Sequence, residues 1–230
     1  MSDLLPHSDF LSQGGAIVVV ILAASVVAAA VFLSRLWALR SDRVAPRKLT
    51  IQVRDLVLRE EEAEAMTLCR MDESPIARIY LAGLRHRGKQ RPVIKEFLLE
   101  VGRHEAMVLQ RGLSVLEVIA VIAPLLGLLG TVWGMIDVFR AIEVHGVGDA
   151  GALAGGIGTA LYTTLAGLLV AIPVRVAHST LMARLDTRVL ELEEMALDFL
   201  ALLVAAQDNE AEGRSELDSA PAEANAPAAS

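Results

Sequence analysis

Three long stretches of this 230-residue sequence contain no Asp, Glu, Lys or Arg, and they limit what the chain can fold into. They cover residues 10–34, 118–136 and 150–174, which are 25, 19 and 25 residues long. A helix of about 20 apolar residues crosses the hydrocarbon core of a bilayer. Buried soluble helices of this kind would need a large surrounding domain, and too little other sequence remains to build one. We therefore expect an all-α membrane protein with three transmembrane helices.

Positive residues predict the orientation, because cytoplasmic segments carry an excess of Lys and Arg. The segment between the first and second stretches holds 16 of the 21 Lys and Arg residues, and none precedes the first stretch. The basic start of a signal peptide is therefore missing, and we interpret the first stretch as a retained helix. The N-terminus is expected outside and the C-terminus inside, with long helices extending into the cytoplasm.

The expected segments follow in chain order. They are a periplasmic N-terminus (1–9), a first transmembrane helix (10–34), a cytoplasmic helical segment (35–117), a second transmembrane helix (118–137), a short periplasmic loop (138–149), a third transmembrane helix (150–174), a cytoplasmic helix (175–207) and a disordered acidic tail (208–230). The tail contributes −5 to the formal net charge of −7, so the rest of the chain is near neutral. Nothing in this charge pattern favours nucleic acid binding.

Local patterns predict structure inside the cytoplasmic segments. Residues 54–69 combine helix formers with a run of acids, which favours a helix with a solvated acidic face. Ser74 and Pro75 are typical of a helix start, residues 85–92 of a basic turn, and residues 92–111 of another helix. After the third span, six apolar residues recur at steps of four and three and should lie on one stripe. These are Leu185, Val189, Leu192, Ala196, Phe199 and Leu203.

Small residues mark one face of the second and third spans, which favours close helix packing. In the second span the pattern consists of Gly127, Gly130, Thr131 and Gly134, whose spacing places them on one helix face. In the third span it consists of Gly155, Thr159, Thr163, Gly167 and Ala171, at steps of four. For the glycines, tight packing is the preferred interpretation.

Thr131 and Thr164 carry hydroxyl groups on or near these faces, so a polar path between the spans is an alternative to simple hydrogen bonding within each helix. Pro124 and Pro173 each free one backbone carbonyl, which either accompanies a kink or faces a polar lumen. Glu117 and Arg175 flank the inner ends of the same spans, where snorkelling at the interface is favoured over pairing.

No acidic or basic residue and no histidine lies in residues 10–34, 118–136 or 150–174. A proton-coupled device needs a titratable group within the membrane field. If this chain handles protons, the carboxylate must therefore come from another polypeptide. The five histidines and the single cysteine, Cys69, form no nucleophile or metal pattern, so no enzyme activity, catalytic residue, metal site or cofactor is expected.

Residues 123–137 (APLLGLLGTVWGMID) and 156–173 (GIGTALYTTLAGLLVAIP) resemble the ExbB/TolQ branch of the MotA/TolQ/ExbB proton channel family. The resemblance implies a homopentamer in the bacterial inner membrane, whose second and third spans surround two helices of an ExbD/TolR-like partner. It also implies that the membrane aspartate of this single-span partner carries the proton, and that Thr131 and Thr164 correspond to pore threonines. The work would be delivered to the periplasm or to an outer-membrane protein, and H⁺ rather than Na⁺ is expected by this analogy.

One position departs from the family pattern. ExbB and TolQ usually have Glu near the start of the third span, where this sequence has Thr159 in Gly156-Ile157-Gly158-Thr159-Ala160-Leu161. The difference suggests a divergent paralogue and puts the role of that acid in doubt here. A membrane scaffold without ion flux stays open as an alternative function, because small-residue faces suit it equally well.

Overall fold

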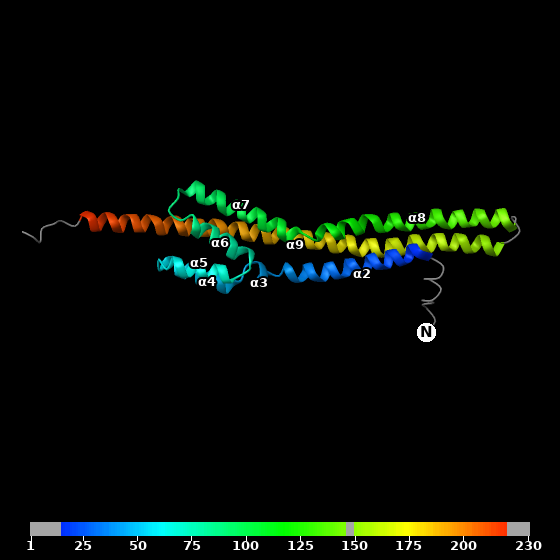
Figure 1. Ribbon diagram of the computed structural model, residues 1–230, viewed down its shortest axis with the longest axis horizontal. Helices are drawn as coiled ribbons and strands as arrows, with labels where there is room; N and C mark the ends of the chain where they lie inside the picture. The colour runs from blue at the N-terminus through cyan, green and yellow to red at the C-terminus, as the bar shows by residue number, and fades with distance from the viewer. Residues whose placement is uncertain (1–14, 146–149, 220–230) are drawn as a thin grey trace, which may run out of the picture. The chain divides into compact units, whose positions relative to one another are not determined.

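The computed structural model describes residues 15–145 and 150–219, and these residues form helices joined by short connections, without a strand (Figure 1). In chain order the helices are α2 (Gly15–Ala38), α3 (Ser41–Val44), α4 (Arg47–Leu58), α5 (Glu62–Met71), α6 (Pro75–Arg85), α7 (Arg91–Gln110), α8 (Leu113–His145) and α9 (Ala150–Ser219). The predicted periplasmic N-terminus, residues 1–9, lies outside the described residues.

Three of these helices are long and apolar enough to cross a membrane, which confirms the predicted fold class. They are α2, residues 113–144 of α8, and residues 153–208 within α9. The predicted periplasmic loop at 138–149 is helical as far as His145 in the structure. The inside and outside assignments remain predictions from the distribution of Lys and Arg.

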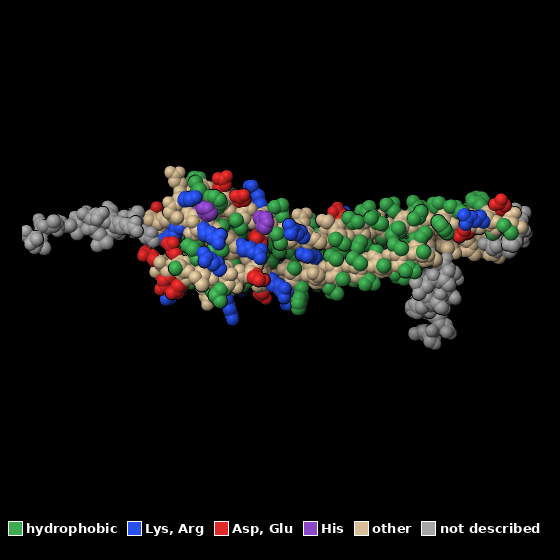
Figure 2. All heavy atoms as spheres, viewed as in Figure 1, with side chains coloured by type: hydrophobic (Ala, Val, Ile, Leu, Met, Phe, Trp, Pro, Cys, Tyr) green, Lys and Arg blue, Asp and Glu red, His purple; other side chains and the backbone are tan. Residues whose placement is uncertain are grey.

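The chain divides into two compact units. Unit 1 contains α2, α8 and the part of α9 up to Arg184, and unit 2 contains α3 to α7 and the part of α9 from Leu185. Figure 2 shows hydrophobic side chains covering most of the visible face of unit 1, while Lys, Arg, Asp and Glu gather on unit 2. A lipid environment suits the first surface and water suits the second.

In unit 1, α2 packs along α8 and buries a narrow stripe that includes Val18, Ile21 and Ala28. Most of the remaining α2 surface is apolar and exposed, including Val26 and Leu33. Such a large exposed apolar surface is unstable in water, so lipid or other protein must cover it. This unit therefore has the character of a membrane domain.

In unit 2, the predicted apolar stripe of α9 forms the core, which confirms that prediction. Five of its six residues are buried and Val189 is half-buried. The rings of Tyr80 on α6 and Phe199 on α9 stack with their centroids 4.2 Å apart. A methyl group at Gly83, one turn along α6 from Tyr80, would lie 3.1 Å from both Leu203 and Phe199. α6 therefore approaches α9 as closely as a glycine allows.

The predicted helix over residues 54–69 is broken in the structure. α4 ends at Leu58 and α5 begins at Glu62, while Glu60 between them adopts the left-handed region with φ of 64°. Acidic residues destabilise the C-terminus of a helix and stabilise the N-terminus of the next one. The run of glutamates from Glu60 therefore ends α4 and starts α5, and the break lets α5 pack back onto α4.

The predicted helix start at Ser74 is confirmed, since its Oγ accepts a hydrogen bond from the Ala77 amide at 3.4 Å and Pro75 opens α6. The predicted basic turn is also present, with Gly88 in the left-handed region. Arg87 in this turn pairs with Glu62 of α5. Glu62, which was predicted to lie on a solvated acidic face, therefore links the basic turn to α5 through this ion pair.

The C-terminal end of α9 differs from the sequence-based expectation. The composition from Asp208 onward predicts disorder, whereas α9 continues to Ser219. Extending an existing helix avoids the cost of nucleation, and Ala, Glu and Leu in this stretch are good helix formers. Residues 220–230 of the predicted tail lie outside the described residues.

A buried ion pair links α6 to α7 in unit 2. Glu105 is 2% exposed, and its Oε2 accepts a hydrogen bond from Nη1 of Arg78 at 2.7 Å. The side chain of Arg78 is 47% exposed. The two partners are therefore not equivalent, because only the carboxylate depends on the pair for its solvation.

We expect Arg78→Met to lower the free energy of unfolding by about 3 kcal/mol, because it removes the hydrogen-bonded cation from a buried carboxylate and leaves only the exposed His104 at 3.6 Å. Glu105→Gln leaves only an exposed cation and should cost about 1 kcal/mol. Thermal unfolding of both variants in detergent measures the difference. Equal losses in the two variants would contradict the asymmetry.

The single cysteine predicts a loss of stability at alkaline pH. Burial, with a smaller contribution from Asp72, raises the pKa of the Cys69 thiol from its ordinary value of 9.0 to about 12. Between these values only the unfolded state ionises, so the free energy of unfolding falls as pH rises, by up to about 1.4 kcal/mol per unit. Unfolding scans from pH 8 to 11 should show a shallower decline for Cys69→Ala, and parallel curves would refute this contribution.

Candidate functional site

The glycines of α8 lie where α8 meets α9. Gly127, Gly130 and Gly134 are buried, and each one faces α9 atoms at short range. A methyl group at Gly130 would lie 2.3 Å from Oγ1 of Thr163, and one at Gly134 would lie 2.9 Å from the carbonyl oxygen of Gly156. No side chain fits at these positions without movement of the helices, so glycine sets the distance between them.

The matching face of α9 differs in part from the predicted stripe. Thr163, Gly167 and Ala171 are buried, as expected of a contact face. Gly155, however, is exposed and a methyl group there would meet nothing within 4 Å. Strict steps of four drift by about 40° per step on a helix of 3.6 residues per turn.

Gly156 and Ala160 therefore replace Gly155 and Thr159 at the start of the contact. A methyl group at Gly156 would lie 2.3 Å from Cγ2 of Val138 on α8, and one at Gly134 would lie 3.1 Å from Cβ of Ala160. We call the contact between these two faces the α8–α9 seam. Its members are Gly127, Gly130, Gly134 and Val138 on α8, and Gly156, Ala160, Thr163 and Gly167 on α9.

One hydroxyl group joins the two helices. Oγ1 of Thr164 donates to the carbonyl oxygen of Gly127 at 3.3 Å. Gly127 makes this possible, because a methyl group there would lie 3.0 Å from Cα of Thr164. The hydroxyl of Thr164 is thus held at the seam rather than bonded within its own helix.

The other two candidate threonines bond within their helices. Oγ1 of Thr131 donates to Leu128 O at 2.7 Å, and Oγ1 of Thr159 donates to Gly155 O at 3.1 Å. Both side chains are half-buried in the chain. Thr131 follows Gly127 by four residues, about 6 Å along the axis, so it lies roughly one turn from the level of Thr164.

The prolines lie inside continuous helices, Pro124 in α8 and Pro173 in α9. Each removes the amide that would bond the carbonyl four residues earlier, at Ala120 and Leu169 respectively. A methyl group at Gly167 would lie 2.6 Å from the carbonyl oxygen of Ala123. The carbonyl oxygen of Ala123 therefore lies on the seam, opposite Gly167.

Glu117 and Arg175 are exposed, and within the described parts of the chain no ion pair joins them. Exposed charges at the ends of apolar helices are typical of snorkelling side chains. The structure brings the small residues and Thr164 together at the seam and keeps these two charged residues apart from it.

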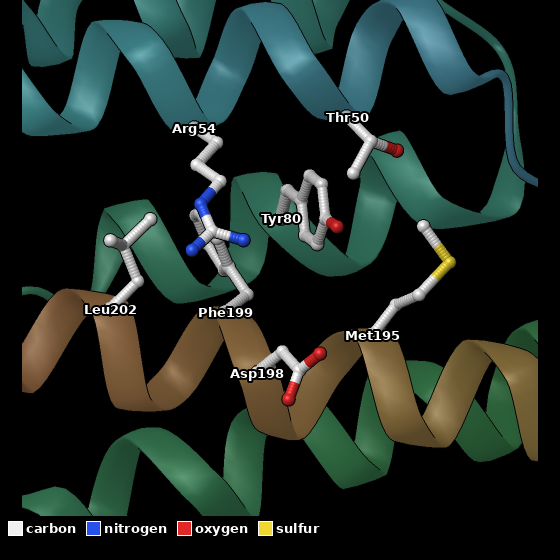
Figure 3. Close-up of a pocket in the computed structure, with 7 residues that line it drawn as sticks. All are labelled: Thr50, Arg54, Tyr80, Met195, Asp198, Phe199 and Leu202. Carbon is white, nitrogen blue, oxygen red and sulfur yellow. The ribbon is translucent and has the colours of Figure 1, made fainter.

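Unit 2 has a small cavity, which is not suited to an organic substrate. It measures about 70 Å³ and is lined by Thr50, Arg54, Tyr80, Met195, Asp198, Phe199 and Leu202 (Figure 3). Ligand sites usually measure 300–1,000 Å³. Burial raises the pKa of Tyr80 to about 12, so its phenol stays neutral at physiological pH. No cluster of metal-ligating side chains occurs in residues 15–145 and 150–219.

Comparison with known proteins identifies the family of this chain. The model of the MotA/TolQ/ExbB proton channel family matches residues 71–194, which is more than half of the chain. The chain belongs to this family. The match includes α6 to α8 and the part of α9 that contains the seam. The ExbB branch suggested by the sequence motifs is supported by individual relatives.

The relatives include ExbB-named proteins from distant organisms. The chain is 33% identical over 172 residues to putative biopolymer transport protein ExbB-like 1 of Synechocystis sp., covering 71% of this chain and 66% of that protein. It is 41% identical over 105 residues to biopolymer transport protein exbB1 of Vibrio cholerae, covering 45% and 44%. It is 30% identical over 186 residues to the putative ExbB homolog of Methanothermobacter thermautotrophicus, covering 80% and 66%. The chain thus spans 44–66% of the length of these relatives.

Sequence reasoning missed two features of the site. It did not identify Gly156 and Ala160 as seam residues, although a search at alternating steps of three and four back from Thr163 would have found them. It also did not predict which backbone atom the hydroxyl of Thr164 would bind. No sequence signal specifies that choice, because it depends on how close Gly127 allows the two helices to come.

We expect Gly130→Ala to lower the free energy of unfolding by about 1–3 kcal/mol, because the added methyl group overlaps Thr163. Gly158→Ala is the matched control, since a methyl group there meets nothing within 4 Å. In that position Ala should be neutral or stabilising, because it favours the helix by about 1 kcal/mol over Gly. Thermal unfolding in detergent compares the two variants, and a Gly130→Ala protein as stable as the control would contradict the seam.

Proposed function

We propose that this chain is the proton-channel subunit of an ExbB/TolQ-like motor in the bacterial inner membrane. In this role it couples the proton motive force to work in the periplasm or at the outer membrane. The single observation that carries the proposal is the α8–α9 seam, which contains hydroxyls and backbone carbonyls but no acid or base. Membership of the proton channel family supports the same role.

The absence of a charge from the spans leads to the second part of the proposal. A proton that crosses the membrane field must be bound and released by a titratable group within the membrane. The sequence supplies no Asp, Glu, His, Lys or Arg in residues 10–34, 118–136 or 150–174. The proton is therefore carried by the aspartate of an ExbD/TolR-like, single-span partner, and this chain supplies the surrounding uncharged wall.

The chain forms a ring around that partner, a homopentamer by analogy with the family. The exposed apolar surface of unit 1 supports an assembly, because α8 alone exposes Leu125, Val132 and Phe139 to more than half of their full extent. Lipid covers part of this surface and neighbouring subunits cover the rest.

Thr131 and Thr164 line the path at the partner carboxylate. Thr164 is held by the Gly127 carbonyl, so its oxygen is left free to accept a hydrogen bond from a protonated aspartate or from water. Thr131 offers a second hydroxyl about one turn away. Thr159 takes the place of the usual family glutamate, and here it supplies a neutral hydroxyl at the start of the third span.

A membrane scaffold without ion flux is the second candidate. The seam is compatible with this function, because glycine packing alone explains the close approach of α8 and α9. The two functions differ in whether the hydroxyl groups matter beyond packing.

Thr164→Val and Thr131→Val test that difference, because valine keeps the shape and removes the hydroxyl. Each hydroxyl hydrogen bond is worth about 1–1.5 kcal/mol, so proton flux through the complex with its partner should fall about five- to tenfold. The measurement is flux in proteoliposomes, with assembly checked by native mass spectrometry.

Thr180→Val is the matched control, because Thr180 also bonds its own helix, at 2.8 Å to Val176 O, but lies outside the apolar stretch. Its flux should be unchanged. Normal flux in both the Thr131 and the Thr164 variants would defeat the pore assignment and leave the scaffold function.

A further inference from the structure

Two helices of unit 2 carry outward-facing apolar stripes that nothing in residues 15–145 and 150–219 covers. On α4, Ile51 is 68% exposed and Leu58 is 61% exposed. On α9, Leu190 is 65% exposed and Leu197 is 46% exposed. In each helix the two residues are seven apart, so they lie on one face at the spacing of a helix–helix contact.

These stripes point away from the core of unit 2. On α4, Leu49, Val53 and Val57 are buried on the opposite side of the helix from Ile51. On α9, Leu192, Phe199 and Leu203 are buried, and Leu190 lies about 140–180° around the helix from them, at about 100° per residue. Both helices are therefore apolar on two faces, only one of which is used within the chain.

Charges of opposite sign flank the two stripes. On α4 the exposed residues Arg47 and Lys48 lie within about 60° of Ile51. The exposed Arg54 lies about 60° from Ile51 on the other side, while Asp55 and Arg59 neutralise each other in an ion pair of 2.8 Å. The α4 stripe is therefore apolar with a net positive border.

On α9 the exposed residues Asp186, Glu193 and Glu194 lie within about 60° of Leu190. The nearby Arg188 instead points about 160° away and pairs with Glu191 at 2.7 Å. The α9 stripe is therefore apolar with a net negative border, and its charge complements that of the α4 stripe.

Lipid is not a suitable cover for these stripes. Arg47, Lys48, Asp186, Glu193 and Glu194 would all have to enter the hydrocarbon with them, at a cost of several kcal/mol. Other exposed large apolar residues of unit 2, such as Met107, have no second exposed apolar residue seven residues away on the same helix. A protein partner with the opposite border is the cover that fits.

We propose that the α4 stripe of one subunit packs against the α9 stripe of a second copy of this chain. This inference rests on the proposed function, because it assigns a contact within the proposed ring. Since the two surfaces are different, the contact is head-to-tail. Such a contact closes into a ring when the rotation per subunit allows it, whereas a patch that binds itself gives only a two-fold dimer.

Paired cysteines test the contact in the full-length protein in membranes, in a Cys69→Ala background. Ile51→Cys and Leu58→Cys are each combined with Leu190→Cys or Leu197→Cys, and disulfide formation is followed on denaturing gels. Parallel helices should join 51 to 190 and 58 to 197, and antiparallel helices should join 51 to 197 and 58 to 190. Each productive pair should give a ladder of covalent oligomers, and each single-cysteine variant should remain monomeric.

Charge reversal provides a second readout that does not depend on cysteine geometry. Lys48→Glu or Glu194→Lys alone should weaken the contact about two- to fivefold, and the double reversal should restore it. Dissociation of the detergent-purified ring with rising salt, followed by native mass spectrometry, measures this effect. Lys95→Glu on α7 is the control and should have no effect.

The outcomes separate this inference from the proposed function. If none of the four cysteine pairs forms a disulfide while native mass spectrometry shows a ring, the contact alone is overturned. Efficient crosslinking of Leu190→Cys to Met107→Cys in its place would assign the α9 stripe to α7 and would also overturn it. Absence of any ring would overturn the contact together with the ring of the proposed function.

Discussion

The close approach of α8 and α9 is the constraint on which the rest of the membrane unit depends. Backbone meets backbone along the seam because Gly127, Gly130 and Gly134 present no side chain to α9. In a bilayer, where lipid tails are as apolar as leucine, such packing replaces the hydrophobic effect as the force between helices. The same closeness brings the hydroxyl of Thr164 within reach of the Gly127 carbonyl, so packing and polar chemistry arise from one set of residues.

Much of this arrangement could be predicted from the sequence because its signals are local. Uncharged stretches of 19–25 residues predicted the three membrane helices, and Ser74 with Pro75 predicted the start of α6. The α9 stripe from Leu185 to Leu203 predicted the core of unit 2, because spacing alone decides which residues share a face.

The misses have a common physical origin, since each depended on an effect beyond a simple pattern. The glutamates near Glu60 were expected to extend one helix, but their charges favour ending α4 and starting α5. Strict steps of four from Gly155 drifted off the contact face, which the structure places at Gly156 and Ala160. The continuation of α9 to Ser219 follows from extension of an existing helix, which composition does not report.

The central claim is a division of labour in which this chain forms an uncharged wall and a second polypeptide contributes the group that titrates. Proton flux into liposomes tests it most directly, with the purified chain reconstituted alone, with its single-span partner, and with a partner whose membrane Asp is replaced by Asn. The account predicts flux only with the intact partner. Comparable flux from the chain alone, or from the complex with the Asn partner, would contradict it.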